Sequence, residues 1–165
     1  MRFRVLVGLV CLVAAGCTSE PEAPPPSADP TTLRHPPAGD VVGQAGRYGG
    51  HAWLGIPYAE PPLGELRWRA PRSPLPWTGT REALAFGDSC PQFASGVGGD
   101  GSAKPGTLVG HEDCLTLNVY APALAGAPAD ARLPVLVWIH GGGNTIGTSH
   151  LYDGSRLASQ HHSWW

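Results

Sequence analysis

The sequence predicts one modest α/β domain that follows an N-terminal leader. Residues 115–120 (Leu-Thr-Leu-Asn-Val-Tyr) alternate strictly, which is typical of a strand with one buried face. Residues 134–139 (Pro-Val-Leu-Val-Trp-Ile) are continuously apolar and end in a glycine cluster, which favours a central parallel strand covered on both faces. Asp153 can cap a short helix that runs through Ala158. Strands and a helix together indicate the α/β class.

The remaining elements are shorter. Between residues 41 and 57, small apolar and aromatic pieces are separated by glycines, which predicts short antiparallel strands. Between residues 57 and 76, repeated prolines exclude a long helix, because proline lacks the backbone N–H and clashes with the preceding turn. We expect an ordered loop there.

Composition excludes several classes of protein. The 165 residues include 23 glycines and 18 prolines, about twice the average share of these two types, while charged residues make up only 15%. Seven of the prolines fall between Pro21 and Pro37. We therefore expect an extended segment that buries no hydrophobic core in this stretch and nowhere else. The net charge of −2 provides no basic surface, and nucleic acid is therefore not an expected partner.

The first 17 residues have the features of a bacterial lipoprotein leader. Two arginines precede the apolar run 5–15, which is shorter than the roughly 20 residues of a membrane-spanning helix but suits a signal peptide. We expect residues 1–16 to be removed, Cys17 to carry lipid and the chain to be anchored at the bacterial cell envelope. The alternative is an ordinary secretory signal, with Cys17 incidental and the product secreted or periplasmic. Residues 17–40 are expected to form a Pro-rich tether.

The most informative chemistry follows the second strand, at His140-Gly141-Gly142-Gly143. Successive glycines leave backbone N–H groups uncovered by any Cβ atom and tolerate positive φ. Such donors stabilise a developing alkoxide, and one of them is worth about 2.7–4 kcal/mol. A flexible turn after a buried strand is the alternative. A phosphate-binding loop is disfavoured, because Thr148 stands where its lysine is required.

Several motifs occur in order along the chain. They are residues 55–64 (Gly-Ile-Pro-Tyr-Ala-Glu-Pro-Pro-Leu-Gly), 66–71 (Leu-Arg-Trp-Arg-Ala-Pro), 77–79 (Trp-Thr-Gly), 89–92 (Ser-Cys-Pro-Gln), 112–120 (Glu-Asp-Cys-Leu-Thr-Leu-Asn-Val-Tyr) and 134–143. This set resembles the type-B carboxylesterases, relatives of the cholinesterases in the α/β-hydrolase superfamily. The resemblance implies that residues 41–159 form the N-terminal part of an α/β-hydrolase fold. It also implies hydrolysis of small-molecule carboxylic esters through a serine acyl-enzyme, with no cofactor and no metal.

The resemblance assigns roles within the glycine cluster. The backbone N–H groups of Gly142 and Gly143 are the implied oxyanion donors. His140 and Gly141 shape the turn. Asn144 replaces the usual aromatic residue of the family, which changes the pocket on the acyl side of the substrate.

Two pairs of residues acquire implied structural roles. In the family, the cysteines equivalent to Cys90 and Cys114 form a disulfide, which an exported chain can keep. Metal binding by this pair is the weaker alternative, because neither a Cys-x-x-Cys spacing nor a nearby His–Cys cluster is present. The resemblance also suggests an ion pair between Arg67 and Glu112. Two separate solvated charges are the alternative.

The sequence also departs from the family. Family enzymes carry a serine in a Gly-x-Ser-x-Gly elbow, and no such segment occurs in the 165 residues. Residues 160–165 (Gln-His-His-Ser-Trp-Trp) replace the expected apolar strand with an aberrant tail that ends in two exposed tryptophans. We expect a shifted reading frame or premature stop after about residue 159, with a natural short form as the alternative. Such a chain is expected to be marginally stable and to expose residues 134–139.

Three functions are therefore open. The first is an esterase-family lipoprotein fragment, truncated before its catalytic triad and inactive alone. The second is a non-catalytic envelope lipoprotein that uses the same fold for binding. The third is an active esterase whose remaining part lies in another reading frame or on another chain.

Overall fold

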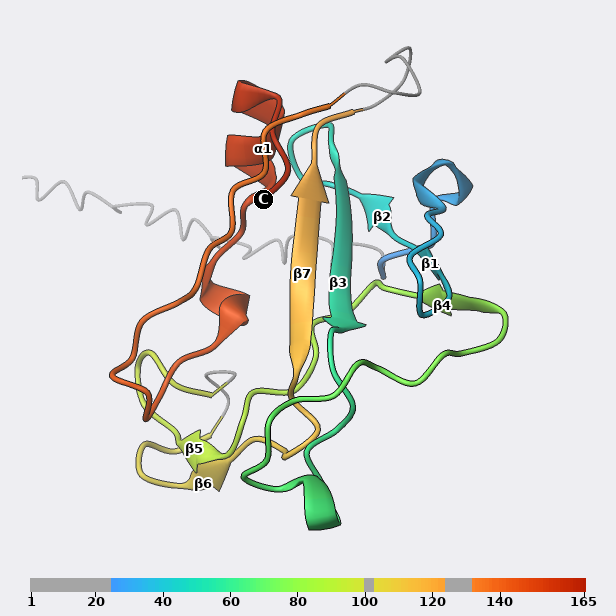
Figure 1. The fold of residues 1–165 in the computed structure, drawn as a ribbon. Helices are drawn as coiled ribbons and strands as arrows, with labels where there is room; N and C mark the ends of the chain where they lie inside the picture. The colour runs from blue at the N-terminus through green and yellow to red at the C-terminus, as the bar shows by residue number, and fades with distance from the viewer. Residues whose placement is uncertain (1–24, 100–102, 124–131) are drawn as a thin grey trace, which may run out of the picture.

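The structure is a computed structural model that describes residues 25–99, 103–123 and 132–165 (Figure 1). The predicted signal peptide 1–16, the lipidation site Cys17 and the start of the tether lie outside the described residues. No helix in the described part of the chain is long and apolar enough to span a membrane.

Three antiparallel strands form the centre of the fold, with the order β2-β3-β7 (Figure 1). They are β2 (Gln44–Ala45), β3 (His51–Pro57) and β7 (Thr116–Ala121). β3 is the middle strand and pairs with β7 along most of its length, for example Ala52 opposite Tyr120. Strands are present at both predicted places, between residues 41 and 57 and at 115–120, but two details differ. The strand at 40–42 pairs in parallel rather than antiparallel fashion, and β7 buries side chains on both faces rather than one, because core residues pack against each side of the sheet.

Two pairs of short strands flank this sheet. β1 (Asp40–Val42) pairs in parallel with β4 (Thr80–Glu82), and β5 (Gln92–Phe93) pairs in antiparallel fashion with β6 (Leu108–Val109). Single turns of 3₁₀-helix occur at η1 (Pro30–Thr32), η2 (Gly64–Leu66) and η3 (Ser149–Leu151). After β3 ends at Pro57, the segment to residue 76 contains only the turn η2, so the predicted loop is confirmed.

The single α-helix of the described residues, α1 (Ser155–His161), lies against β7. The carboxylate of Asp153 accepts a hydrogen bond from the Ser155 N–H at 2.9 Å, which satisfies one of the donors that a helix start leaves open. The helix ends at His162, which adopts a left-handed conformation with φ of 47°. The predicted helix is therefore confirmed, and it runs three residues beyond Ala158.

Alternation along β3 and β7 produces two clusters of buried side chains, one on each face of the sheet. Trp53 is 1% exposed and packs on one face with Val41, Ala83 and Ala121. Its indole Nε1 donates to the backbone oxygen of Thr32 at 2.9 Å, so burial of the ring leaves its polar atom satisfied.

The opposite face carries the second cluster. Ala52, Leu54 and Tyr120 of the sheet form it together with Ala158 of α1. Burial, together with the charge of Asp153, raises the pKa of the Tyr120 phenol to about 12.

Residues 134–139 do not form the predicted central strand. One isolated parallel bridge joins Val135 to Trp164, and Val137 and Ile139 are 77% and 85% exposed. A central strand is stabilised by neighbours on both edges, and in the described residues only the backbone around Trp164 lies beside this segment. The predicted exposure of the apolar side chains in residues 134–139 is confirmed.

The predicted exposure of the C-terminal tryptophans is wrong. Trp164 is partly buried and stacks on Trp53 with ring centroids 5.9 Å apart. Trp165 is partly buried on the other face, 5.5 Å from the ring of Tyr120. Each of the two large rings packs beside one of the core clusters. The tail sequence shows no strand pattern, so this packing could not be predicted from it.

Trp53 is expected to dominate the stability of the sheet. Replacing Trp53 by Ala removes a fully buried ring and is expected to cost about 3–5 kcal/mol, or to unfold the chain outright. Trp68→Ala removes the same side chain from a position that is 95% exposed and should change stability by less than about 0.5 kcal/mol. Urea unfolding followed by circular dichroism compares the two; equal effects would contradict the assigned core.

Candidate functional site

The glycine cluster forms a tight loop whose geometry requires glycine. Gly142 has φ of 132°, and its carbonyl oxygen accepts from the N–H groups of Thr145 at 3.1 Å and Ile146 at 3.2 Å. A Cβ atom on Gly142 would overlap the carbonyl oxygen of Ile146. Gly143 and Asn144 follow with φ of 62° and 58°. The chain therefore reverses here through conformations that L-residues adopt at a cost.

The N–H groups of Gly142 and Gly143 donate to no acceptor in the described part of the chain. Gly143 is exposed and Gly142 is half-buried. Adjacent backbone donors without an internal acceptor can bind a negatively charged oxygen.

His140 closes the base of the same loop. Its Nδ1 lies 2.9 Å from the carbonyl oxygen of Gly141, and its ring stacks on Tyr152 at 6.3 Å. A Cβ on Gly147 would approach His140 Nδ1 to 2.6 Å, so the two ends of the loop touch only because Gly147 has no side chain.

Gln92 attaches the loop to β5. The side-chain amide donates from Nε2 to the backbone oxygen of Gly147 at 2.9 Å, and its Oε1 accepts from the Gly147 N–H at 2.8 Å. Nε2 also donates to the carbonyl oxygen of Cys90 at 3.0 Å. Gln92 is 7% exposed, so these bonds are sheltered from competing water. In the sequence, Gln92 is only one member of the Ser-Cys-Pro-Gln motif, and its polar side chain two residues after Cys90 is the available signal.

Further contacts join the same two segments. Ser89 Oγ donates to Thr148 Oγ1 at 3.0 Å, and His150 Nε2 lies 3.0 Å from the carbonyl oxygen of Gly87. The rings of Phe86 and His150 are 4.6 Å apart. Segments 86–92 and 147–150 therefore form one connected unit around the loop.

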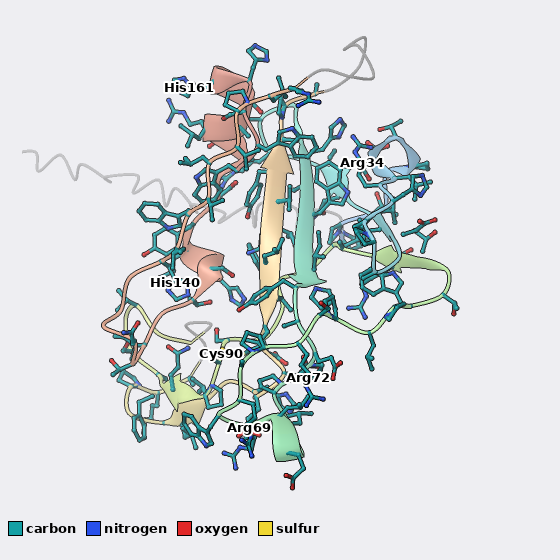
Figure 2. All side chains as sticks on the ribbon, viewed as in Figure 1. Arg34, Arg69, Arg72, Cys90, His140 and His161 are labelled. Atoms are coloured by element: carbon teal, nitrogen blue, oxygen red, sulfur yellow. A yellow bond between two sulfur atoms is a disulfide. The ribbon has the colours of Figure 1, made fainter. Side chains whose placement is uncertain are left out.

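A disulfide fixes this unit to β7. Cys90 and Cys114 are bonded, with Cα atoms 5.1 Å apart, which confirms the pairing implied by the resemblance and leaves no thiolate pair for a metal. Closing a loop with a sequence separation of 24 contributes about 3.5 kcal/mol in the chain-entropy treatment. Figure 2 shows Cys90 below the start of β7 and His140 to the side of it. No group of three or more His, Cys, Asp or Glu side chains suited to a metal occurs among the described residues.

Arg67 and Glu112 lie together at the edge of this region. Arg67 Nη2 is 2.6 Å from Glu112 Oε1, and the two side chains are 52% and 35% exposed. An ion pair with this much solvent contact contributes about 0–1 kcal/mol. Its contribution to positioning the disulfide loop is therefore small beside that of the covalent bond.

The described serines have no partner that would activate them as nucleophiles. The imidazoles of His140 and His150 contact backbone oxygens, as given above, and no histidine among the described residues contacts a serine hydroxyl. Ser89 donates to Thr148. Within the described residues, the loop thus offers backbone donors without the nucleophile and base that an acyl-transfer reaction requires.

Comparison with known proteins places the chain in a family. The profile described as "Carboxylesterase family" matches residues 31–162. Phenmedipham hydrolase of Pseudarthrobacter oxydans is 46% identical over 121 residues, covering 72% of this chain and 23% of that protein. Para-nitrobenzyl esterase of Bacillus subtilis is 44% identical over 114 residues, covering 68% and 22%. Human carboxylesterase 3 is 41% identical over 165 residues, covering 94% and 28%.

Solved structures agree. A PNB esterase matches with a TM-score of 0.67 and 38% identity over 81% of this chain and 26% of that chain, and a thermophilic PNB esterase gives the same values. The fold is the N-terminal part of an α/β-hydrolase. The chain belongs to the carboxylesterase family, and it spans about a quarter of the length of the relatives that it matches.

Gln92 is expected to control the order of the glycine loop. Gln92→Ala removes both bonds to Gly147 and leaves its partly buried backbone groups without these partners, a loss of about 1–3 kcal/mol. The Gly147 amide should then exchange its hydrogen roughly ten- to a hundredfold faster. Phe93→Ala, on the same strand but 63% exposed, serves as the control and should leave this exchange unchanged. Unaltered exchange at Gly147 in Gln92→Ala would show that the loop is held elsewhere.

Proposed function

We propose that residues 140–143 are the oxyanion-binding element of a carboxylesterase site, with the N–H groups of Gly142 and Gly143 as donors. Three observations support this: these N–H groups lack an acceptor in the described residues, the loop conformation excludes a side chain at Gly142, and the family is that of the carboxylesterases. The family match carries the most weight, because exposed N–H groups of an ordinary turn also lack an internal acceptor and bind water instead.

The reaction is hydrolysis of small carboxylic esters. A serine attacks the ester carbonyl, the resulting alkoxide is stabilised by the two N–H groups, the alcohol leaves, and water releases the acyl group. The serine, its histidine and the acid are not recognisable in these 165 residues. We therefore propose that these residues contribute one half of the site and do not hydrolyse esters by themselves.

A chimera tests the positive half of this proposal. Residues 41–159 replace the matching N-terminal part of the para-nitrobenzyl esterase of Bacillus subtilis, and hydrolysis of a chromogenic short-chain ester is measured. We expect an active chimera. Gly142→Ala in the chimera should lower kcat about 100- to 1000-fold, because the added Cβ displaces both donors.

Gly96→Ala in the same chimera is the control, since a Cβ there meets no atom within 4 Å. It should leave kcat within about twofold. An active chimera that tolerates Gly142→Ala would overturn the oxyanion assignment. Ester turnover by the purified 165-residue chain alone would overturn the proposal that these residues supply only one half of the site.

We further propose that the chain is exported and held at the cell envelope by lipid on Cys17. The apolar leader and the small residues before Cys17 support this. Expressed in a bacterium, the chain should partition into detergent, and Cys17→Ser should move it to the aqueous phase, whereas Cys11→Ser should not. Equal partitioning of the two variants would favour an ordinary secretory signal. Detergent partitioning combined with an inactive chimera would favour a non-catalytic envelope protein.

A further inference from the structure

An open pocket lies beside the turn η2. Its volume is about 510 Å³, within the range of sites that hold small ligands, and all its lining residues come from one short stretch: Glu65, Arg69, Ala70, Pro71 and Arg72. Figure 2 shows Arg69 and Arg72 beside this turn, apart from His140 of the glycine loop. The ester chemistry proposed above uses none of these residues.

The backbone places the two arginines on the same side of the chain. Ala70 precedes a proline, which disfavours helical conformations, and Pro71 holds its own φ at about −65°. Both residues therefore favour the extended polyproline II form, in which side chains three residues apart lie on the same edge. Arg69 and Arg72 have this spacing, and both line the pocket.

Main-chain hydrogen bonds hold both arginines in place. The Arg69 N–H donates to the carbonyl oxygen of Leu66 at 3.2 Å, and the carbonyl oxygen of Arg72 accepts from the Glu60 N–H at 3.0 Å. The two side chains are exposed. Their backbone is thus fixed, while the guanidinium groups remain accessible to a ligand.

The two guanidinium groups have no partner within the described residues. Neither Arg69 nor Arg72 forms an ion pair there, whereas Arg67 of the same stretch pairs with Glu112. Two unpaired cations at one pocket repel each other and attract an anion. The planar N–H donors of guanidinium match the oxygen atoms of a phosphate group, so phosphate is the anion that this pair suits best.

Glu65 brings the opposite charge to the same pocket. It is exposed and forms no ion pair with either arginine in the part of the chain that the structure describes. Its carboxylate repels a plain phosphate ion and attracts a cation. An ammonium group with N–H donors forms charge-assisted hydrogen bonds to carboxylate oxygens. The three charges therefore select a ligand that carries an ammonium group next to its phosphate.

We propose that Glu65, Arg69 and Arg72 bind an organic phosphate with a primary ammonium group, the chemistry of phosphoethanolamine. The two guanidinium groups hold the phosphate oxygens, and the carboxylate holds the ammonium group. This chemistry occurs in a soluble phosphate ester and in a phospholipid headgroup. Because all three side chains are exposed, water and salt screen each contact, and we expect a dissociation constant of about 1 mM.

The probe is soluble O-phosphoethanolamine, titrated into the isotope-labelled 165-residue protein and followed by the amide signals in NMR. We expect saturable shifts at residues 65–72 that weaken as salt is added. Inorganic phosphate, which lacks the ammonium group, should bind roughly tenfold more weakly. Phosphocholine should also bind more weakly, because its quaternary nitrogen has no N–H to donate.

Variants separate charge recognition from loss of structure. Arg69→Gln and Arg72→Gln should each weaken binding of O-phosphoethanolamine about tenfold. Arg47→Gln is the matched control, since Arg47 is also exposed and lies outside the pocket, and it should leave binding unchanged. Glu65→Gln should weaken binding of O-phosphoethanolamine and strengthen binding of inorganic phosphate, because one carboxylate attracts the first and repels the second. A general loss of structure would weaken both.

Vesicles identify the source of the phosphate. Cosedimentation is measured for the Cys17→Ser protein, so that lipid on Cys17 does not contribute, with phosphatidylcholine vesicles that contain or lack phosphatidylethanolamine. Binding that requires phosphatidylethanolamine and is weakened by Arg72→Gln supports the proposal with a lipid headgroup as ligand. Saturable binding of the soluble probe without vesicle binding supports it with a soluble ester as ligand.

Three results would overturn the proposal. The first is no shift at residues 65–72 up to about 10 mM probe combined with no binding to vesicles that contain phosphatidylethanolamine. The second is equal binding by Arg72→Gln and Arg47→Gln. The third is a Glu65→Gln variant that binds both phosphate probes as the unaltered protein does.

Discussion

The antiparallel pairing of β3 with β7 is the interaction on which the rest of the structure depends. It joins segments far apart in the chain, and a register shift between Trp53 and Ile56 adapts it to its surroundings. Gly55 lies in this shift with φ of 68°, and its N–H donates to the Asn118 side chain at 3.0 Å. The Leu54 N–H turns away from β7 and donates to Ala83 O at 2.8 Å. Alternation along β3 thus connects the sheet to the segment that contains β4, and the two core clusters form on either face.

The glycine loop depends on a different kind of force. Its ring–ring contacts are few, and much of it is exposed. Its position comes from the amide of Gln92, which bonds both backbone groups of Gly147, and from the disulfide that anchors the neighbouring Cys90 to Cys114. Directional bonds on a covalently fixed support hold donors in place more tightly than apolar packing, which tolerates sliding. A site that stabilises charge requires such fixed donors.

Local pattern was sufficient to predict the elements whose partners lie within the described chain. The alternation at 115–120 corresponds to β7, and the Asp153 cap corresponds to α1. The disulfide followed from resemblance, because spacing alone does not select a partner for Cys90. The prediction of a central strand at residues 134–139 was wrong, because an apolar segment forms a buried strand only where neighbouring strands and helices cover it. The contact of Gln92 with Gly147 could not be predicted, since its two residues are distant in sequence and share no periodic pattern.

Residues 134–147 are held at both ends and open in the middle. Trp164 bonds the first end through Pro134 and Leu136, and Gln92 bonds the last end through Gly147. Between them lie the unbonded backbone of residues 137–140 and then the donors of Gly142 and Gly143. A segment fixed at two points can still bow between them, so the direction of the donors depends on how straight residues 137–140 are.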